Sequence, residues 1–204
     1  IKSVVSRIIE KCPEELAILE RDVDRLKNVL QPFPRVTHND AAKILRGELE
    51  VNGKNALKVQ EEDLKNAHEQ LAVVQAEIAE REEKIKTASK GERKFNEGKI
   101  IQLRKEVEIL TEKTRNIPGW IESARNFSDD NDFGNSDETV LTRVFDAPVM
   151  VYNWPAKIKS FYMKEVDGNP DLVKGVDLLA PDGYGEIIGG SERETDINML
   201  LKKI

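Results

Sequence analysis

The sequence has 204 residues, enough for one domain or for one domain with an appendage, and a formal net charge of −6 argues against nucleic-acid binding through overall charge. Charged residues make up 34% and aromatic residues 5%, which favours long exposed helices, and the single cysteine, Cys12, excludes an internal disulfide framework. We find no membrane-spanning apolar run and no signal peptide, so we expect a cytoplasmic protein with no membrane partner.

Helical patterns fill the first thirty residues. Apolar side chains keep helical spacing from Ile1 to Cys12, which indicates that the sequence starts inside a helix and is a piece of a longer protein. Pro13 suits the first turn of a second helical segment, whose apolar stripe continues to Leu30.

A short strand followed by a helix is predicted next. Residues 35–37 are extended in character, and Thr37 with Asp40 has the spacing of a capping box for a helix through Leu45. We expect His38 to be a surface or turn residue and not a catalyst, because no Cys, Ser or carboxylate partner stands at a characteristic spacing from it.

Heptads predict a coiled coil over residues 55–117. In a first run, apolar residues recur at every seventh position: Leu57, Leu64, Leu71, Ile78 and Ile85. In a second run they follow mainly three- and four-residue steps: Ile100, Leu103, Val107, Leu110 and Ile117. A reversal is plausible at residues 89–92, and the first run is acidic and the second basic, so we expect an antiparallel hairpin roughly 45 Å long.

Residues 118–120 (PGW) are predicted to end this arm. A polar loop over 126–137 and a short helix from Glu138 follow. Strands are then predicted over 148–153 and 158–166, with the intervening turn at 154–155.

Alternation along the second of these strands assigns a face to each side chain. Phe161 and Met163 fall on the core face, and Ser160 and Tyr162 fall on the other. Tyr162 would then present its phenol to a cleft, although a half-buried, merely amphipathic tyrosine explains the pattern equally well.

Two apolar runs around a Pro-Asp-Gly turn predict a β-hairpin over residues 173–194. With the turn centred between Pro181 and Asp182, Asp177 lies opposite Glu186. Facing carboxylates repel each other unless a cation lies between them, and Mg²⁺ is the natural candidate.

A glycine pair follows the second acid of this hairpin. A bulge at residues 189–190 would turn Glu186 and Arg193 toward one cleft. The alternative is an edge hairpin with solvated acids and a flexible glycine kink.

This part of the sequence resembles the catalytic domain of the asparaginyl-tRNA synthetases, class II enzymes of the aspartyl, asparaginyl and lysyl subgroup. The resemblance is carried by residues 159–164 (KSFYMK), 177–181 (DLLAP) and 185–194 (GEIIGGSERE). It implies an α+β fold, a partial antiparallel class II sheet flanked by helices. Residues 1–54 and 118–204 would belong to the catalytic domain, with residues 55–117 inserted as a coiled-coil hairpin.

The resemblance also implies roles for single residues. Glu186 would hold Mg²⁺ on the phosphates of ATP, and Asp177 would support the same metal region. Gly189 falls where aspartyl enzymes commonly have a serine that touches the metal, and it offers only backbone. Arg193 would bind the carboxamide oxygen of asparagine, and Tyr162 would lie beside the amino-acid pocket.

The implied reaction is ATP-dependent ligation of asparagine to tRNA(Asn) through an asparaginyl-adenylate, by an enzyme that is a homodimer at full length. We find none of the three class II signature motifs in the sequence, assign no certain catalytic residue, and expect the chain alone to be inactive. Three alternatives stay open: an aspartyl-tRNA synthetase, a synthetase-derived asparagine synthetase, and a non-catalytic coiled-coil interaction protein.

The arm has three possible roles. It could be a self-paired decoration, it could touch tRNA phosphates or a partner through its basic second helix, or it could use exposed heptad positions for dimer or partner contact. The basic residues concerned are Lys99, Arg104, Lys105, Lys113 and Arg115.

Overall fold

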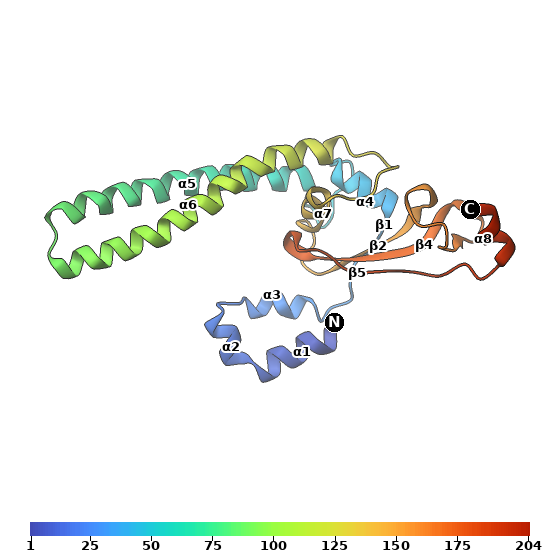
Figure 1. Cartoon of the computed structure of the whole chain (residues 1–204), viewed down its shortest axis with the longest axis horizontal. Helices are drawn as coiled ribbons and strands as arrows, with labels where there is room; N and C mark the ends of the chain where they lie inside the picture. The colour runs from blue at the N-terminus through green and yellow to red at the C-terminus, as the bar shows by residue number, and fades with distance from the viewer. The chain divides into compact units, whose positions relative to one another are not determined.

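The computed structural model describes residues 1–204 and divides them into two compact units (Figure 1). One unit combines Ile1–Leu57 with Ser123–Ile204, and the other consists of Lys58–Glu122. The fold is α+β, with a five-stranded sheet in the first unit and a helical hairpin in the second. None of its helices is both long and apolar enough to span a membrane.

The second unit contains most of α5 (Ala56–Thr87) and α6 (Lys90–Arg125), which run antiparallel as a coiled-coil hairpin (Figure 1). This confirms the predicted arm. Its core consists of heptad residues from both helices: Ala67, Leu71, Val74, Ile78, Leu103, Val107 and Leu110. Ser89 precedes α6 and caps its start, since its backbone N–H and hydroxyl both donate to the Glu92 carboxylate.

The prediction that Pro118 ends the arm was wrong. Helix α6 continues through Pro118 to Arg125, although proline removes one helical hydrogen bond. The apolar spacing also continues beyond Pro118, and Ile117, Ile121 and Ala124 are all buried. Burial of this stripe outweighs the local effect of the proline.

The first unit begins with three short helices, α1 (Lys2–Lys11), α2 (Pro13–Ile18) and α3 (Val23–Asn28). Strand β1 (Arg35–Thr37) leads directly into α4 (His38–Leu45). The Thr37 hydroxyl caps α4 by accepting a 3.1 Å hydrogen bond from the Asp40 backbone N–H, as the sequence predicted.

His38 is buried, so its predicted surface position was wrong. Its ring lies against Phe127, Phe133 and Trp154, with the Trp154 centroid 4.7 Å away, and its Nε2–H donates to the Asn131 carbonyl oxygen. Burial lowers the pKa of His38 and favours the neutral ring. No local sequence pattern indicates this cluster, because its aromatic residues come from distant segments.

The sheet has the order β1-β2-β4-β3, and β5 pairs with β4 as well. Strands β2 (Val149–Pro155), β3 (Glu165–Val166), β4 (Asn169–Ala180) and β5 (Gly185–Ser191) pair antiparallel, whereas β1 is parallel to β2. Helix α7 (Asn135–Thr142) packs beside the β4–β5 turn, and α8 (Ile197–Lys203) ends the chain.

A bulge at Asn153 extends β2 beyond the predicted turn. Asn153 has a φ of 56°, and the register with β4 shifts between Tyr152 and Trp154. The shift places Trp154 on the face that already carries Val149 and Val151, and all three side chains are buried. Residues 154–155 therefore belong to the strand.

The predicted strand over residues 158–166 is mostly absent. A short 3-10 helix, η1 (Ala156–Ile158), is followed by an isolated bridge between Met163 and Arg193 and by the two-residue strand β3. Phe161 is 49% exposed, so its assignment to the core was wrong. The segment lies at the edge of the sheet, where one partner strand does not enforce regular alternation.

Substitution of Gly183 by alanine is expected to destabilise the first unit by about 2 kcal/mol. Gly183 ends the turn η2 (Pro181–Gly183) with a φ of 81°, and an added Cβ would lie 2.8 Å from Thr139 Cγ2. Thermal unfolding with Gly168→Ala as the matched control tests this, because Gly168 has a φ of 78° with open space around it. Equal losses of stability in the two variants would show that the positive φ, and not the clash with Thr139, causes the effect.

Candidate functional site

The β4–β5 hairpin has a register different from the predicted one. Ala180 pairs with Gly185, Leu179 with Glu186, and Asp177 with Gly189. The prediction that Asp177 directly faces Glu186 was wrong, because the connection between the strands is longer than the assumed reversal.

A bulge at Ile187 returns the two acids to one face of the hairpin. Leu178 pairs with Ile188 and Leu179 with Glu186, so Ile187 is the extra residue of β5. Glu186 therefore shares a face with Asp177 and Gly189. The sequence predicted such a bulge, which reverses the face of the following residues, but placed it at residues 189–190. Those two glycines instead continue the regular ladder.

Both carboxylates lie over Gly189. A Cβ built on Gly189 would overlap Glu186 Oε1 and lie 3.2 Å from Asp177 Oδ1. Glycine at this position therefore leaves the space in which the two carboxylate groups approach each other.

The surroundings of Asp177 and Glu186 disfavour the ionised form of both carboxylates. Burial raises the pKa of Asp177, and the opposing attraction of Lys159 does not cancel this effect. Burial and then repulsion from Asp177 raise the pKa of Glu186. A divalent ion between the two groups would favour their ionised forms.

Lys159 is a site residue that the sequence did not single out. Its Nζ lies 3.2 Å from Asp177 Oδ2, 3.0 Å from Asp132 Oδ1, and 3.7 Å from the centroid of the Trp154 ring. The partners come from three separate segments, so no local sequence signal could reveal them.

Glu138, at the start of α7, is a second residue that the sequence did not single out for the site. Its Oε2 accepts a 3.2 Å hydrogen bond from the Glu186 backbone N–H and so supports the bulged strand. Burial, together with repulsion from Glu186 and Asp177, raises the pKa of Glu138 despite that hydrogen bond.

Arg193 and Tyr162 lie together. The Arg193 guanidinium carbon is 4.3 Å from the centroid of the Tyr162 ring, and the Glu194 backbone N–H donates to the Tyr162 carbonyl oxygen at 2.9 Å. Alternation from Gly189 places Arg193 on the side of β5 that carries the carboxylates. Tyr162 is 39% exposed and is accessible to solvent.

The donor set fits a magnesium ion that also binds phosphate. No group of three or more His, Cys, Asp or Glu side chains is arranged to hold a metal ion alone. Mg²⁺ commonly uses one or two carboxylates, with substrate phosphates and water as its remaining ligands. Asp177 and Glu186 suit that type of site.

The basic residues predicted for tRNA contact do not form one stripe on α6. Arg104 and Lys105 point about 100° apart, since an α-helix has about 3.6 residues per turn. Arg104 is paired with Glu82 of α5 at 2.9 Å. Lys99 and Lys113 are two heptads apart and share one side of the helix.

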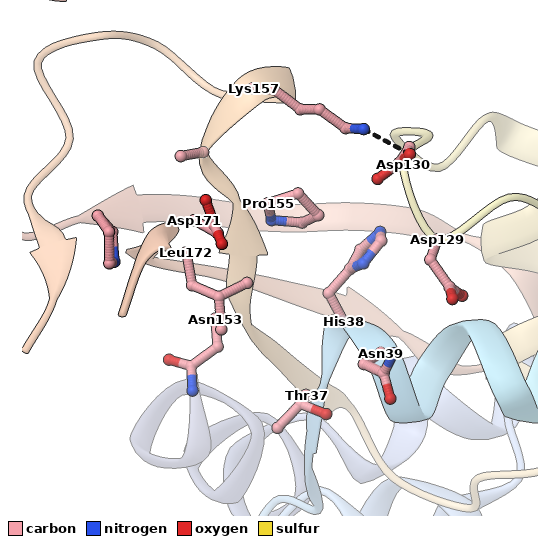
Figure 2. Close-up of a pocket in the computed structure, with 12 residues that line it drawn as sticks. Thr37, His38, Asn39, Asp129, Asp130, Asn153, Pro155, Lys157, Asp171 and Leu172 are labelled. Atoms are coloured by element: carbon pink, nitrogen blue, oxygen red, sulfur yellow. Dashed lines mark ion pairs between the residues drawn. The ribbon is translucent and has the colours of Figure 1, made fainter. Parts of the chain in front are cut away.

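A separate cavity of about 580 Å³ contains none of the predicted site residues (Figure 2). The start of α4 and the end of β2 contribute Asn39 and Asn153 to its wall. Asp129, Asp130 and Asp171 also line it, and Lys157 is ion-paired with Asp130. Its acidic wall disfavours a phosphate ligand.

Glu138→Gln is expected to gain stability relative to the unsubstituted chain as pH rises from about 4.5 to neutral. The raised pKa means that folding favours the protonated carboxyl, so this contribution is present below the usual pKa of 4.5 and is lost as pH rises through the raised value. Glutamine keeps an oxygen for the Glu186 N–H and cannot ionise. Urea unfolding of both proteins at several pH values measures the difference, and a pH-independent difference would contradict the assignment.

Comparison with known families gives a match over the whole chain. The profile of the family described as tRNA synthetases class II (D, K and N) matches residues 1–204. The chain is similar to the asparagine–tRNA ligase of Streptococcus mutans, with 35% identity over 205 residues, 100% of this chain and 31% of that protein. It is also 31% identical to the asparagine–tRNA ligase of Herpetosiphon aurantiacus, and the match covers 100% of this chain and 32% of that protein.

A solved structure of a protein with the same type of name is also similar to this chain. The asparaginyl-tRNA synthetase from Pyrococcus horikoshii complexed with asparaginyl-adenylate aligns with a TM-score of 0.57 and 28% identity, over 100% of this chain and 30% of that chain. The chain thus spans about a third of the length of the curated relatives it matches.

Proposed function

The chain belongs to the class II tRNA synthetases of the aspartate, lysine and asparagine group, and on this premise we propose that it is part of an asparaginyl-tRNA synthetase. The complete enzyme would activate asparagine with ATP and Mg²⁺ to an asparaginyl-adenylate and transfer the amino acid to tRNA(Asn). The unit formed by Ile1–Leu57 and Ser123–Ile204 would belong to its catalytic domain, and we expect a cytoplasmic homodimer.

The convergence of Asp177 and Glu186 above Gly189 is the observation that carries the ATP and Mg²⁺ part of this proposal, and the similarity to asparagine–tRNA ligases supports the amino acid. The two carboxylates would hold Mg²⁺, which neutralises charge on the ATP phosphates and positions them for attack by the amino acid. Gly189 leaves room for the carboxylates, and Glu138 holds the backbone of Glu186. The protein's part in the reaction is then positioning and electrostatic stabilisation.

Arg193 and Tyr162 would bind the amino acid. The guanidinium N–H groups of Arg193 can donate to the carboxamide oxygen of asparagine, and the Tyr162 ring restrains the guanidinium from one face. A guanidinium also binds carboxylates, so Arg193 alone does not discriminate asparagine from aspartate. The aspartyl enzyme is therefore the second candidate, with the fold and the carboxylate pair in common.

Pyrophosphate exchange with the complete enzyme tests the proposal. We expect exchange that depends on asparagine and not on aspartate, followed by asparagine transfer to tRNA(Asn). Aspartate-dependent exchange would indicate an aspartyl-tRNA synthetase. Asparagine formation without tRNA charging would indicate a synthetase-derived asparagine synthetase. No exchange with either amino acid would favour a non-catalytic coiled-coil interaction protein. We expect no exchange by the 204-residue chain alone, and activity of that chain would contradict this.

The arm would contribute to tRNA binding through Lys99 and Lys113. In the complete enzyme, the double substitution Lys99→Glu and Lys113→Glu is expected to weaken tRNA binding about tenfold near 0.1 M salt and to reduce the salt dependence by about two phosphate contacts. Lys65→Glu on the acidic helix α5 is the matched control. Equal effects of both changes, measured by filter binding at several salt concentrations, would assign the arm to another partner.

A further inference from the structure

Lys159 is a largely buried lysine with partners on several sides. Its side chain is 15% exposed, although lysine side chains usually remain in solvent. Asp132 accepts two hydrogen bonds from Nζ at 3.0 and 3.2 Å, and the Trp154 ring covers another side of the ammonium group. Contacts from a loop and from β2 thus fix the ammonium group beside β4.

The two oxygens of Asp177 have different neighbours. Oδ2 accepts the hydrogen bond from Lys159 at 3.2 Å. Oδ1 points toward the space above Gly189, where the Glu186 carboxylate also lies. One oxygen of Asp177 is therefore engaged by the protein, and the other faces the second acid.

We propose that Lys159 is a positioning residue that holds Asp177 Oδ2 and thereby presents Oδ1 to the metal between Asp177 and Glu186. This inference rests on the proposed function. Ligating carboxylates depend on hydrogen bonds behind them for their orientation, and removal of such partners commonly lowers metal affinity 10- to 100-fold. Without Lys159, no hydrogen bond from this ammonium group would hold Oδ2, and Asp177 could leave the rotamer that directs Oδ1 toward Gly189.

A competing role for Lys159 predicts the opposite result. If the Lys159 ammonium group instead competed with the metal ion for Asp177, its removal would remove a positive charge that repels the metal and would raise metal affinity. If its role were only to anchor η1 and the segment that follows, its removal would change stability and leave metal affinity unchanged. The direction of the affinity change therefore separates the three roles.

Manganese titration of the ¹⁵N-labelled 204-residue chain tests this without catalytic activity, since bound Mn²⁺ broadens nearby amide signals. We expect broadening centred on Gly189 and Gly190. Lys159→Met is expected to require at least about tenfold more Mn²⁺ for half broadening. Lys159→Arg, which keeps a cation over Trp154, is expected to remain within about threefold of the unsubstituted chain.

Two further variants make the result specific. Lys157→Met removes a neighbouring exposed lysine that pairs with Asp130, and it should leave the titration unchanged. Asp177→Asn should abolish the broadening, and if it does not, the carboxylate pair of the proposed function is wrong. If Asp177→Asn abolishes broadening while Lys159→Met leaves it unchanged or strengthens it, only the positioning role is overturned. Amide spectra away from the site report whether each variant is folded.

Discussion

Glu186→Gln in the complete enzyme is expected to lower asparagine-dependent pyrophosphate exchange by about 10² to 10³-fold. The neutral amide keeps the size of the side chain and removes one of the two negative charges that converge above Gly189. Mg²⁺ binds carboxylate oxygens far better than amide oxygens when phosphates supply its other ligands. Folding should be unaffected, because Glu186 is exposed and its loss relieves repulsion from Asp177.

Glu192→Gln is the matched control for this substitution. Glu192 lies close to Glu186 in the sequence but pairs with Lys164 and Lys174, away from Gly189. Exchange by this variant should stay within about threefold of the unsubstituted enzyme, since partly exposed ion pairs contribute little. Equal losses in the two variants would show that the β5 segment, and not the carboxylate at position 186, supports the reaction.

Gly189→Ala is expected to lower exchange by about 100-fold with little loss of stability. The added methyl group would overlap Glu186 Oε1 and crowd Asp177 Oδ1, so both carboxylates would leave the positions that suit the metal. The overlapped atom is the end of a flexible side chain, so rotation of Glu186 relieves the clash without moving the strand.

Gly190→Ala is a close control because it adds the same methyl group to the next residue. A Cβ at Gly190 meets no atom within 4 Å, and its side points to the opposite face of β5. We expect exchange within about twofold of the unsubstituted enzyme, and thermal unfolding should not separate the two variants. Normal exchange by Gly189→Ala would place the metal elsewhere.

Local patterns were sufficient to predict the helical hairpin, the cap of α4 and the β4–β5 hairpin. Each depends on residues within one or two turns or on a repeating heptad, so neighbouring residues determine it. Helix α6 continued past Pro118 because apolar spacing over a longer stretch outweighed one unfavourable residue.

The two bulges required knowledge of the partner strands. Asn153 and Ile187 are ordinary residues in sequence, and their extra positions follow from the pairing of β2 and β5 with β4. The roles of Lys159 and Glu138 depend on contacts between segments remote in the sequence, which spacing cannot reveal. The residues of the hairpin could thus be chosen from the sequence, whereas their register and supporting contacts could not.

The bulge at Ile187 makes the position of the second acid depend on strand pairing as well as on spacing. Glu186 and Gly189 are three residues apart, so the same residues paired without a bulge would place the acid on the far side of the sheet. Every residue that binds the ligand would still be encoded, yet the pair would be separated. Substitutions that straighten this ladder can therefore abolish the site during evolution without changing any residue that binds the ligand.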